Sequence, residues 1–347
     1  MSGDISPTIP AGIGTGVGSM PGTDPRSTAK LVAAELDWPF LAELPARGLG
    51  ADMIGRTASV LVEIALDTAR VSPGEHPTYR IAGRPGHLVS RARGYLDADL
   101  DAAEEVFERT GLRGDGRPFT ITLCGPYTFA ATVELASGHK VLHDRGAVRD
   151  VAASMAEGLA ELAADVERRL GCAVIVQLDE PLIGAVLDGR VRPLTRLDVM
   201  PEVSAEGAAA LLGSIAARVN RPVVVHSCAT PRWDVLSQLS NIAVSLDVST
   251  LDAAQYDSFG SFVDRGGRVV AGVIPTTRPS RPISVDRTSS RLADLIDRIG
   301  LPRKVLAEQV AVSPTCGLAG ADQAWAGKAL GIAAQIGQLC AEDPMAL

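Results

Sequence analysis

Short runs of aliphatic, often β-branched residues alternate along this chain with longer segments in which apolar positions recur at helical spacing. Several of the short runs are apolar on both faces, which is typical of parallel strands covered by helices. The runs predict eight strands, at residues 13–18, 38–44, 119–124, 173–179, 223–226, 243–247, 269–273 and 310–313. The amphipathic segments predict helices at 24–36, 147–170, 204–219, 288–299 and 321–340.

Eight strands separated by helices favour an α/β fold in which residues 1–347 form a single (β/α)8 barrel, a TIM barrel. Residues 68–98, rich in Pro, Gly and Arg, are predicted to be an insertion between the second and third strands. A doubly wound sheet is the alternative. The glycines at 12, 14, 16 and 18 do not support it, because they alternate and do not follow the G-x-G-x-x-G pattern of dinucleotide-binding folds.

Polar side chains gather where the predicted strands end. In a barrel of this kind the active site forms at the carboxyl ends of the strands. All these side chains are therefore expected to face one mouth. They are Ser19 after the first strand, Glu43 in the second, Asp179 in the fourth, His226 and Cys228 at the fifth, Asp247 at the sixth and Cys316 after the eighth.

His226, Cys228 and Cys316 form a set of soft metal ligands. His226 and Cys228 alternate along an extended chain, so both side chains can point to one side. Zinc favours sulfur and imidazole ligands, and three protein ligands with one open position suit catalysis. The pattern predicts a zinc site. Asp247, at the end of the neighbouring strand, is expected either to be a fourth ligand or to orient His226.

Two further carboxylates are expected at the mouth. Asp179 and Glu180 end a strand side by side, and Glu180 is as readily explained as a helix cap or an ion-pair partner. Asp179 and Glu43 would suit a substrate ammonium group. A soft metal beside two carboxylates fits a small amino-acid thiol.

Charge and composition exclude other classes of function. The net charge of −8 supplies no basic surface for a nucleic acid or an anionic membrane. No apolar run approaches the roughly 20 residues that span a bilayer, and residues 1–7 do not resemble a secretory signal. A cytoplasmic location is therefore expected. Five scattered cysteines are too few for a disulfide scaffold.

Four motifs resemble those of the cobalamin-independent methionine synthase family, in its C-terminal catalytic barrel. They keep the family's order and cover nearly the whole chain, and the last two together are highly specific. They are Gly18-Ser19-Met-Pro-Gly-Thr23, similar to Gly-Ser-Phe-Pro-Gln-Thr; Gln177-Leu-Asp179-Glu180-Pro181, similar to Gln-Ile-Asp-Glu-Pro; His226-Ser-Cys228, similar to His-Met-Cys; and Ser313-Pro-Thr-Cys316-Gly317-Leu318, similar to Asn-Pro-Asp-Cys-Gly-Leu.

The resemblance implies a zinc ion held by His226, Cys228 and Cys316, with Asp247 where the family has a Glu. It also implies that Ser19 binds the carboxylate, and Asp179 the amine, of homocysteine. The match around Glu43 is loose. Because the full-length family enzymes have a second barrel, the chain resembles the shorter, single-barrel relatives.

The function implied is methylation of homocysteine to methionine through a zinc-bound thiolate. The donor is expected to be a methyl-folate or a methyl-corrinoid, free or delivered by a partner protein. Two alternatives stay open: methylation of another small thiol, and a non-catalytic relative that binds zinc or methionine.

Overall fold

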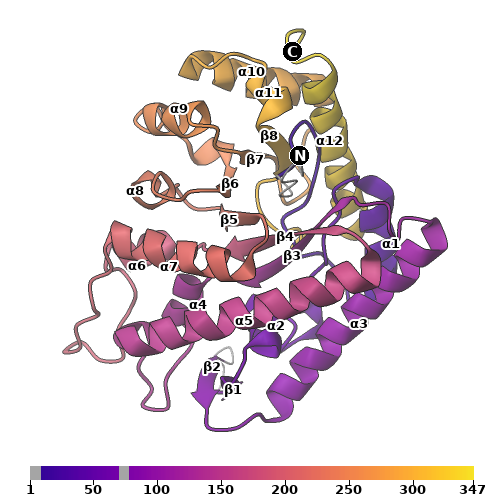
Figure 1. Cartoon of the computed structure of the whole chain (residues 1–347). Helices are drawn as coiled ribbons and strands as arrows, with labels where there is room; N and C mark the ends of the chain where they lie inside the picture. The colour runs from indigo at the N-terminus through magenta and orange to yellow at the C-terminus, as the bar shows by residue number, and fades with distance from the viewer. Residues whose placement is uncertain (1–8, 70–77) are drawn as a thin grey trace, which may run out of the picture.

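A computed structural model describes residues 9–69 and 78–347. Within them, six parallel strands follow one another in chain order in one curled sheet (Figure 1). The strands are β3 (Pro118–Cys124), β4 (Ala173–Asp179), β5 (Val223–Ser227), β6 (Ile242–Asp247), β7 (Val269–Ile274) and β8 (Val310–Pro314). This confirms the α/β fold and gives it a TIM-barrel-like form.

The first two predicted strands are extended segments joined to their neighbours by single parallel bridges. Gly14 pairs with Val312 of β8, Ser19 with Glu43, and Phe40 with Thr120 of β3. The two segments thus link the edge strands of the six-stranded sheet. They are less regular than predicted because glycine disfavours strands and Pro39 has no N–H to donate.

Helices cover the outer face of the sheet (Figure 1). The five predicted helices are confirmed, and each begins at an Asp or Ser whose side chain accepts a backbone N–H of the first turn. They are α1 (Pro25–Glu35), α5 (Arg145–Leu170), α7 (Ala205–Val219), α10 (Val285–Ile299) and α12 (Gln323–Glu342). In the described residues, no helix combines the length and apolar character needed to cross a membrane.

The remaining elements were not among the predicted strands and helices. Most are short, but α3 has 24 residues. They are η1 (Pro45–Arg47), α2 (Met53–Val60), β1 (Ala65–Thr68), β2 (Tyr79–Ala82), α3 (His87–Thr110), α4 (Pro126–Thr132), η2 (Val141–His143), α6 (Ile183–Leu187), α8 (Trp233–Leu236), η3 (Val248–Thr250), α9 (Tyr256–Asp264) and α11 (Val305–Glu308).

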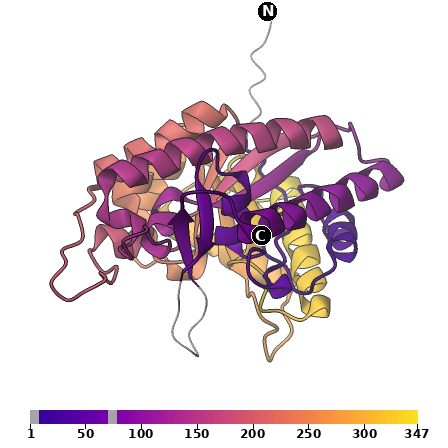
Figure 2. The ribbon, with the colours of Figure 1, turned by 90° about the horizontal axis from the view of Figure 1, so that it is seen from below.

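The range 68–98, predicted to be an insertion, starts at the last residue of β1, contains β2 and runs into α3. β1 and β2 pair as an antiparallel hairpin, which lies beside α3 in both views of the chain (Figures 1 and 2). From His87 onward the range belongs to α3, which packs against α1 and α2 in the helical layer. Residues 70–77 lie outside the described residues.

The two faces of the sheet differ in chemistry, and this difference places the site. Residues facing the helices are aliphatic, as in Val223 and Val225 of β5. On the inner face, a layer around Trp38 is apolar. Two residues further along β4, β5, β6 and β8, this face becomes polar, with Gln177, His226, Ser245 and Ser313, all buried. The interior is therefore sealed at one end and chemically functional at the carboxyl ends of the strands.

Candidate metal and substrate site

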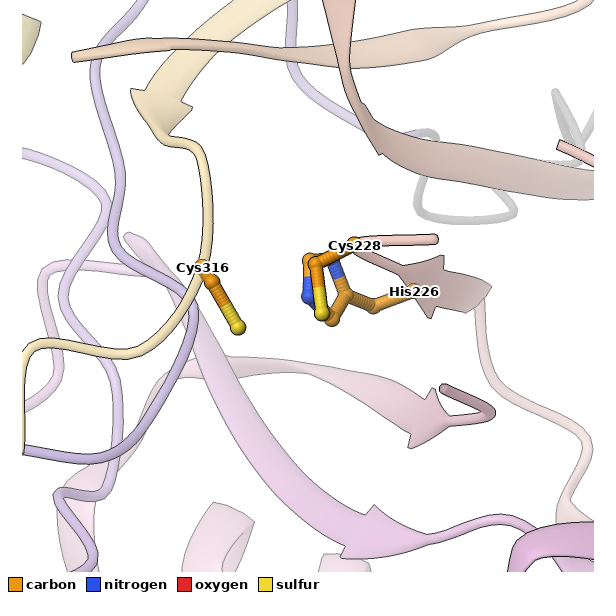
Figure 3. Close-up of side chains that lie close together, drawn as sticks. All are labelled: His226, Cys228 and Cys316. Atoms are coloured by element: carbon orange, nitrogen blue, oxygen red, sulfur yellow. The ribbon is translucent and has the colours of Figure 1, made fainter. Parts of the chain in front are cut away.

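Three potential metal ligands converge at the carboxyl ends of β5 and β8. One ligand atom from each of His226, Cys228 and Cys316 lies within 4.8 Å of the other two. Figure 3 shows Cys316 facing the other two side chains from the opposite side of the mouth. His226 is buried and both thiols are half-buried. The side chains that the sequence predicted as a metal set are therefore brought together from segments almost 90 residues apart.

Gly272 of β7 explains how Cys316 reaches the mouth. The register of β7 against β8 shifts between Gly272 and Ile274, and the N–H of Thr315 donates to the carbonyl of Ile274 at 2.9 Å. A Cβ at Gly272 would lie 2.8 Å from the Cα of Thr315. Only a glycine lets the turn that carries Cys316 fold over the end of β7.

The imidazole of His226 is oriented for a ligand. Its Nδ1 lies 2.9 Å from the Oγ of Ser245, which is also buried. Its Nε2 is buried and has no hydrogen-bond partner among the described residues. A buried polar atom without a partner is unfavourable unless something else binds it. Nitrogen and sulfur donors are those that zinc prefers, so these three side chains can hold a metal ion.

The two thiols titrate as a pair. The thiol of Cys316, followed by the imidazole of His226, lowers the pKa of Cys228 well below its usual value. The pKa of Cys316 is raised, first by its hydrogen bond to Cys228 and then by burial. The lowered pKa favours a thiolate at Cys228, the form in which a cysteine binds a metal ion.

Asp247 has a different environment from the other predicted ligands. Its carboxylate lies outside the group defined by the 4.8 Å separation. One of its oxygens accepts the N–H of Ser249 at 2.8 Å and so caps η3. Coordination by Asp247 stays a proposal.

Asp179 lies at the end of β4, directly beside His226 in the parallel register. Gln177 donates from its Nε2 both to Asp179 Oδ1 at 2.8 Å and to the carbonyl of Val17 at 2.6 Å. Burial raises the pKa of Asp179 to about 6, while His226 and Gln177 act to lower it. At neutral pH Asp179 is therefore mainly a fixed anion.

Glu43 is a second buried carboxyl group. Its side chain is 4% exposed, and its Oε1 has no hydrogen-bond partner within the described part of the chain. Burial raises its pKa to about 8, although Arg56 acts in the opposite direction and Asp179 adds to the rise. At neutral pH Glu43 is therefore mainly protonated.

Ser19 lies between Glu43 and the turn that follows Cys316. It bridges to Glu43 on one side, and its carbonyl accepts the N–H of Leu318 at 2.7 Å on the other. A Cβ at Gly317 would collide with the Oγ of Ser19. The hydroxyl thus lies against the backbone of the residue that follows Cys316.

Glu180 has a structural role. It is fully buried and accepts the N–H groups of Tyr127 and Thr128, each at 2.8 Å, together with the hydroxyl of Thr128. These bonds cap α4. The interpretation of Glu180 as a helix cap is confirmed, although the N–H groups that it accepts lie 52 and 53 residues earlier in the chain.

Sequence analysis missed two residues that shape the site, Ser245 and Gln177. Each lies two positions before a predicted site residue on the same strand, Asp247 and Asp179 respectively. Because alternate residues of a strand share a face, that spacing could have identified both.

The chain matches the family described as "Cobalamin-independent synthase, Catalytic domain" over residues 13–338. It belongs to this family. The resemblance drawn from the four sequence motifs is thereby confirmed, as is the expectation that the chain is an enzyme. A search of curated proteins gave no match.

Two solved structures have the same fold. One is a B12-independent methionine synthase from Shewanella sp. W3-18-1 in complex with selenomethionine, with a TM-score of 0.60 and 12% identity over 97% of this chain and 100% of that one. The other is a methyltransferase from Methanosarcina mazei, with a TM-score of 0.56 and 15% identity over 98% of this chain and 94% of that one. Similarity at this level of identity shows the family fold and leaves the substrate undefined.

Proposed function

We propose that this member of the synthase family is a zinc-dependent thiol S-methyltransferase that converts homocysteine to methionine. The observation that carries the proposal is the group of His226, Cys228 and Cys316, with the Nε2 of His226 buried and without a hydrogen-bond partner in residues 9–69 and 78–347. Membership in the catalytic-domain family supports the reaction class.

A zinc ion bound by these side chains would supply a Lewis acid that ionises an incoming thiol at neutral pH. The other groups of the mouth would place the substrate. Asp179, anionic above pH about 6, would accept the ammonium group. Glu43, with its pKa of about 8, would be neutral. Its Oε1, which has no hydrogen-bond partner among the residues that the structure describes, would accept a second N–H. The ammonium would then meet one negative charge, not two.

Ser19 would donate its hydroxyl to the substrate carboxylate from the opposite side, beside Gly317. With both ends held, the substrate sulfur would be directed at the methyl donor. Its lone pair forms the new S–CH3 bond while the bond between the methyl group and the donor breaks. That electron pair stays with the donor, and the thiol proton is released to solvent. No protein nucleophile is needed, and positioning supplies the rate enhancement.

The test is an activity screen of the purified chain with homocysteine against methyl-folate and methyl-corrinoid donors. Methionine formation with one donor is expected, and Cys316→Ser should abolish it. Cys172 is a buried thiol just before the amino end of β4, so Cys172→Ser is the matched control and should stay active. If no donor yields methionine with zinc-loaded protein, the proposal fails.

Asp179→Asn distinguishes two possible substrates, homocysteine and a thiol that lacks an amino group. With an amino-acid thiol, the variant loses the partner of the ammonium, and KM should rise by roughly tenfold or more, since a hydrogen bond to a charged group contributes about 1.5–3 kcal/mol. An unchanged KM would point to a thiol without an ammonium group.

A further inference from the structure

The turn that follows Cys228 is held from outside the site. Ala229 and Thr230, the two residues after the ligand, are exposed, so burial does not fix their conformation. The chain is anchored again at Pro231, whose carbonyl accepts Gln255 at 3.4 Å, and at Arg232. The position of Cys228 therefore depends on β5 before it and on these anchors after it.

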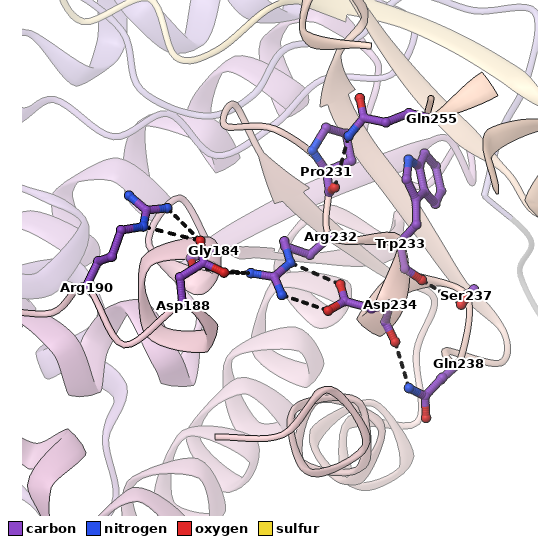
Figure 4. A network of polar contacts seen from close by, with 10 residues as sticks. All are labelled: Gly184, Asp188, Arg190, Pro231, Arg232, Trp233, Asp234, Ser237, Gln238 and Gln255. Carbon is purple, nitrogen blue, oxygen red and sulfur yellow. Dashed lines mark hydrogen bonds and ion pairs between the residues drawn. The ribbon is translucent and has the colours of Figure 1, made fainter. Parts of the chain in front are cut away.

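Arg232 makes the most extensive of these contacts (Figure 4). Its Nε and Nη2 donate to the two carboxylate oxygens of Asp234, at 3.0 and 2.7 Å. Its Nη1 donates to Asp188 at 2.7 Å and to the carbonyl of Gly184 at 3.3 Å. The guanidinium is 23% exposed, whereas its carboxylate partners are almost half exposed. Because the planar guanidinium binds both carboxylates at once, it fixes their relative position in a way that a lysine ammonium cannot.

The partners of Arg232 belong to two different parts of the mouth. Asp234 lies in α8, directly after the Cys228 turn, while Gly184 and Asp188 belong to α6 and its C-cap. α6 follows Asp179 at the end of β4 by only a few residues. Arg232 thus connects the segment after the metal ligand to the segment after the carboxylate that would bind substrate.

We propose that Arg232 is a positioning residue of the metal site. It fixes the turn after Cys228 against α6, so that the sulfur keeps its place relative to Cys316 and Asp179. This inference rests on the proposed zinc site. Residues that hydrogen-bond a metal ligand directly commonly change metal affinity by about 10–100-fold. Arg232 acts through the turn that follows Cys228 and not on the sulfur itself, so we expect an effect at the low end of that range, whereas half-exposed ion pairs contribute little to folding. Arg232 should therefore affect metal binding much more than stability.

The test compares Arg232→Gln with Arg190→Gln. Arg190 belongs to the same network, binds Asp188 from its outer side at 2.9 Å and is 65% exposed, so it controls for charge and for disturbance of the network. The dissociation constant for zinc is measured by competition with a chromophoric chelator. The absorption spectrum of the cobalt(II)-substituted chain reports ligand geometry independently of activity.

Arg232→Gln should bind zinc roughly tenfold more weakly and shift the cobalt bands, while its melting temperature stays within about 3 °C of the unaltered chain. Arg190→Gln should bind zinc within about twofold of the unaltered chain. Asp188→Ala, which removes the acceptor of Arg232 Nη1 and keeps the guanidinium, should weaken zinc binding in the same direction as Arg232→Gln.

Unchanged zinc affinity and an unchanged cobalt spectrum in Arg232→Gln would overturn the inference. So would an equal loss of affinity in Arg190→Gln, because the effect would then belong to the surface network as a whole. Failure of the unaltered chain to bind zinc is a separate outcome, which refutes the proposed function itself.

Discussion

Replacing Glu43 with Gln should remove a pH-dependent loss of stability. Burial raises the pKa of this carboxyl group from 4.5 to about 8. Between these pH values the folded chain retains a proton that the unfolded chain has lost. The free energy of unfolding therefore falls as pH rises through this window, and the penalty is complete above pH 8. Gln has the same size and no charge, so it does not incur the penalty.

A pKa that moves from 4.5 to about 8 corresponds to roughly 5 kcal/mol, an upper limit because the folded chain relaxes around the charge. We expect a measured difference of about 2–4 kcal/mol. Asp179 and Glu180 also have raised pKa values, about 6 and about 7. Their ionisation also lowers the free energy of unfolding as pH rises. Glu43→Gln will therefore keep the part of the pH dependence that comes from Asp179 and Glu180, and will lose only the part that comes from Glu43.

The assay is urea unfolding of the metal-free chain at pH 5 and at pH 9, for the unaltered protein and for Glu43→Gln. The unaltered protein should lose about 2–4 kcal/mol more than the variant between the two pH values, since the unfolded carboxyl is already mostly ionised at pH 5. Glu308→Gln, at a side chain that is 57% exposed, is the control and should behave like the unaltered protein. Equal losses in the unaltered protein and Glu43→Gln would show that Glu43 is ionised at neutral pH, and the proposed division of charge with Asp179 would be wrong.

Two further substitutions test how the ligands and the substrate are held. Ser245→Ala removes the contact to His226 Nδ1 and should weaken zinc binding by about 10–100-fold in a chelator competition. Ser245→Thr retains a hydroxyl and is the control. Equal zinc affinities for Ser245→Ala and the unaltered chain would contradict the role of Ser245 in orienting His226. Gly317→Ala should displace the hydroxyl of Ser19 and raise KM for the thiol by roughly tenfold, from the loss of one hydrogen bond to a charged group. Gly320→Ala, where a Cβ would meet no atom of the described residues within 4 Å, should leave KM unchanged. An unaltered KM in Gly317→Ala would mean that Ser19 does not bind substrate.

The parts of the site that could be predicted from sequence are those governed by periodicity. His226 and Cys228 alternate along one strand and so point to the same face. Asp179 ends a strand with the same apolar pattern, and the carboxyl ends of parallel strands meet at one mouth. These local rules were sufficient for the fold class, for the five predicted helices and for placing His226, Cys228 and Asp179 at one mouth, but they did not reveal the 24-residue helix α3.

The parts that could not be predicted depend on contacts between distant segments. The access of Cys316 to the mouth requires the bulge at Gly272. The contact between Ser245 and His226 requires the register of β5 on β6. Asp247, predicted as a fourth ligand or as a group that orients His226, caps η3 with one carboxylate oxygen, a local contact that the strand pattern does not reveal; its coordination stays a prediction.

The zinc content of the purified chain tests the central claim most directly. After purification without chelators, the unaltered protein and Cys172→Ser should each contain about one zinc ion per chain. Cys316→Ser and His226→Ala should contain almost none under the same conditions. A zinc-free unaltered protein that cannot be reconstituted, or full zinc occupancy in both ligand variants, would contradict the account.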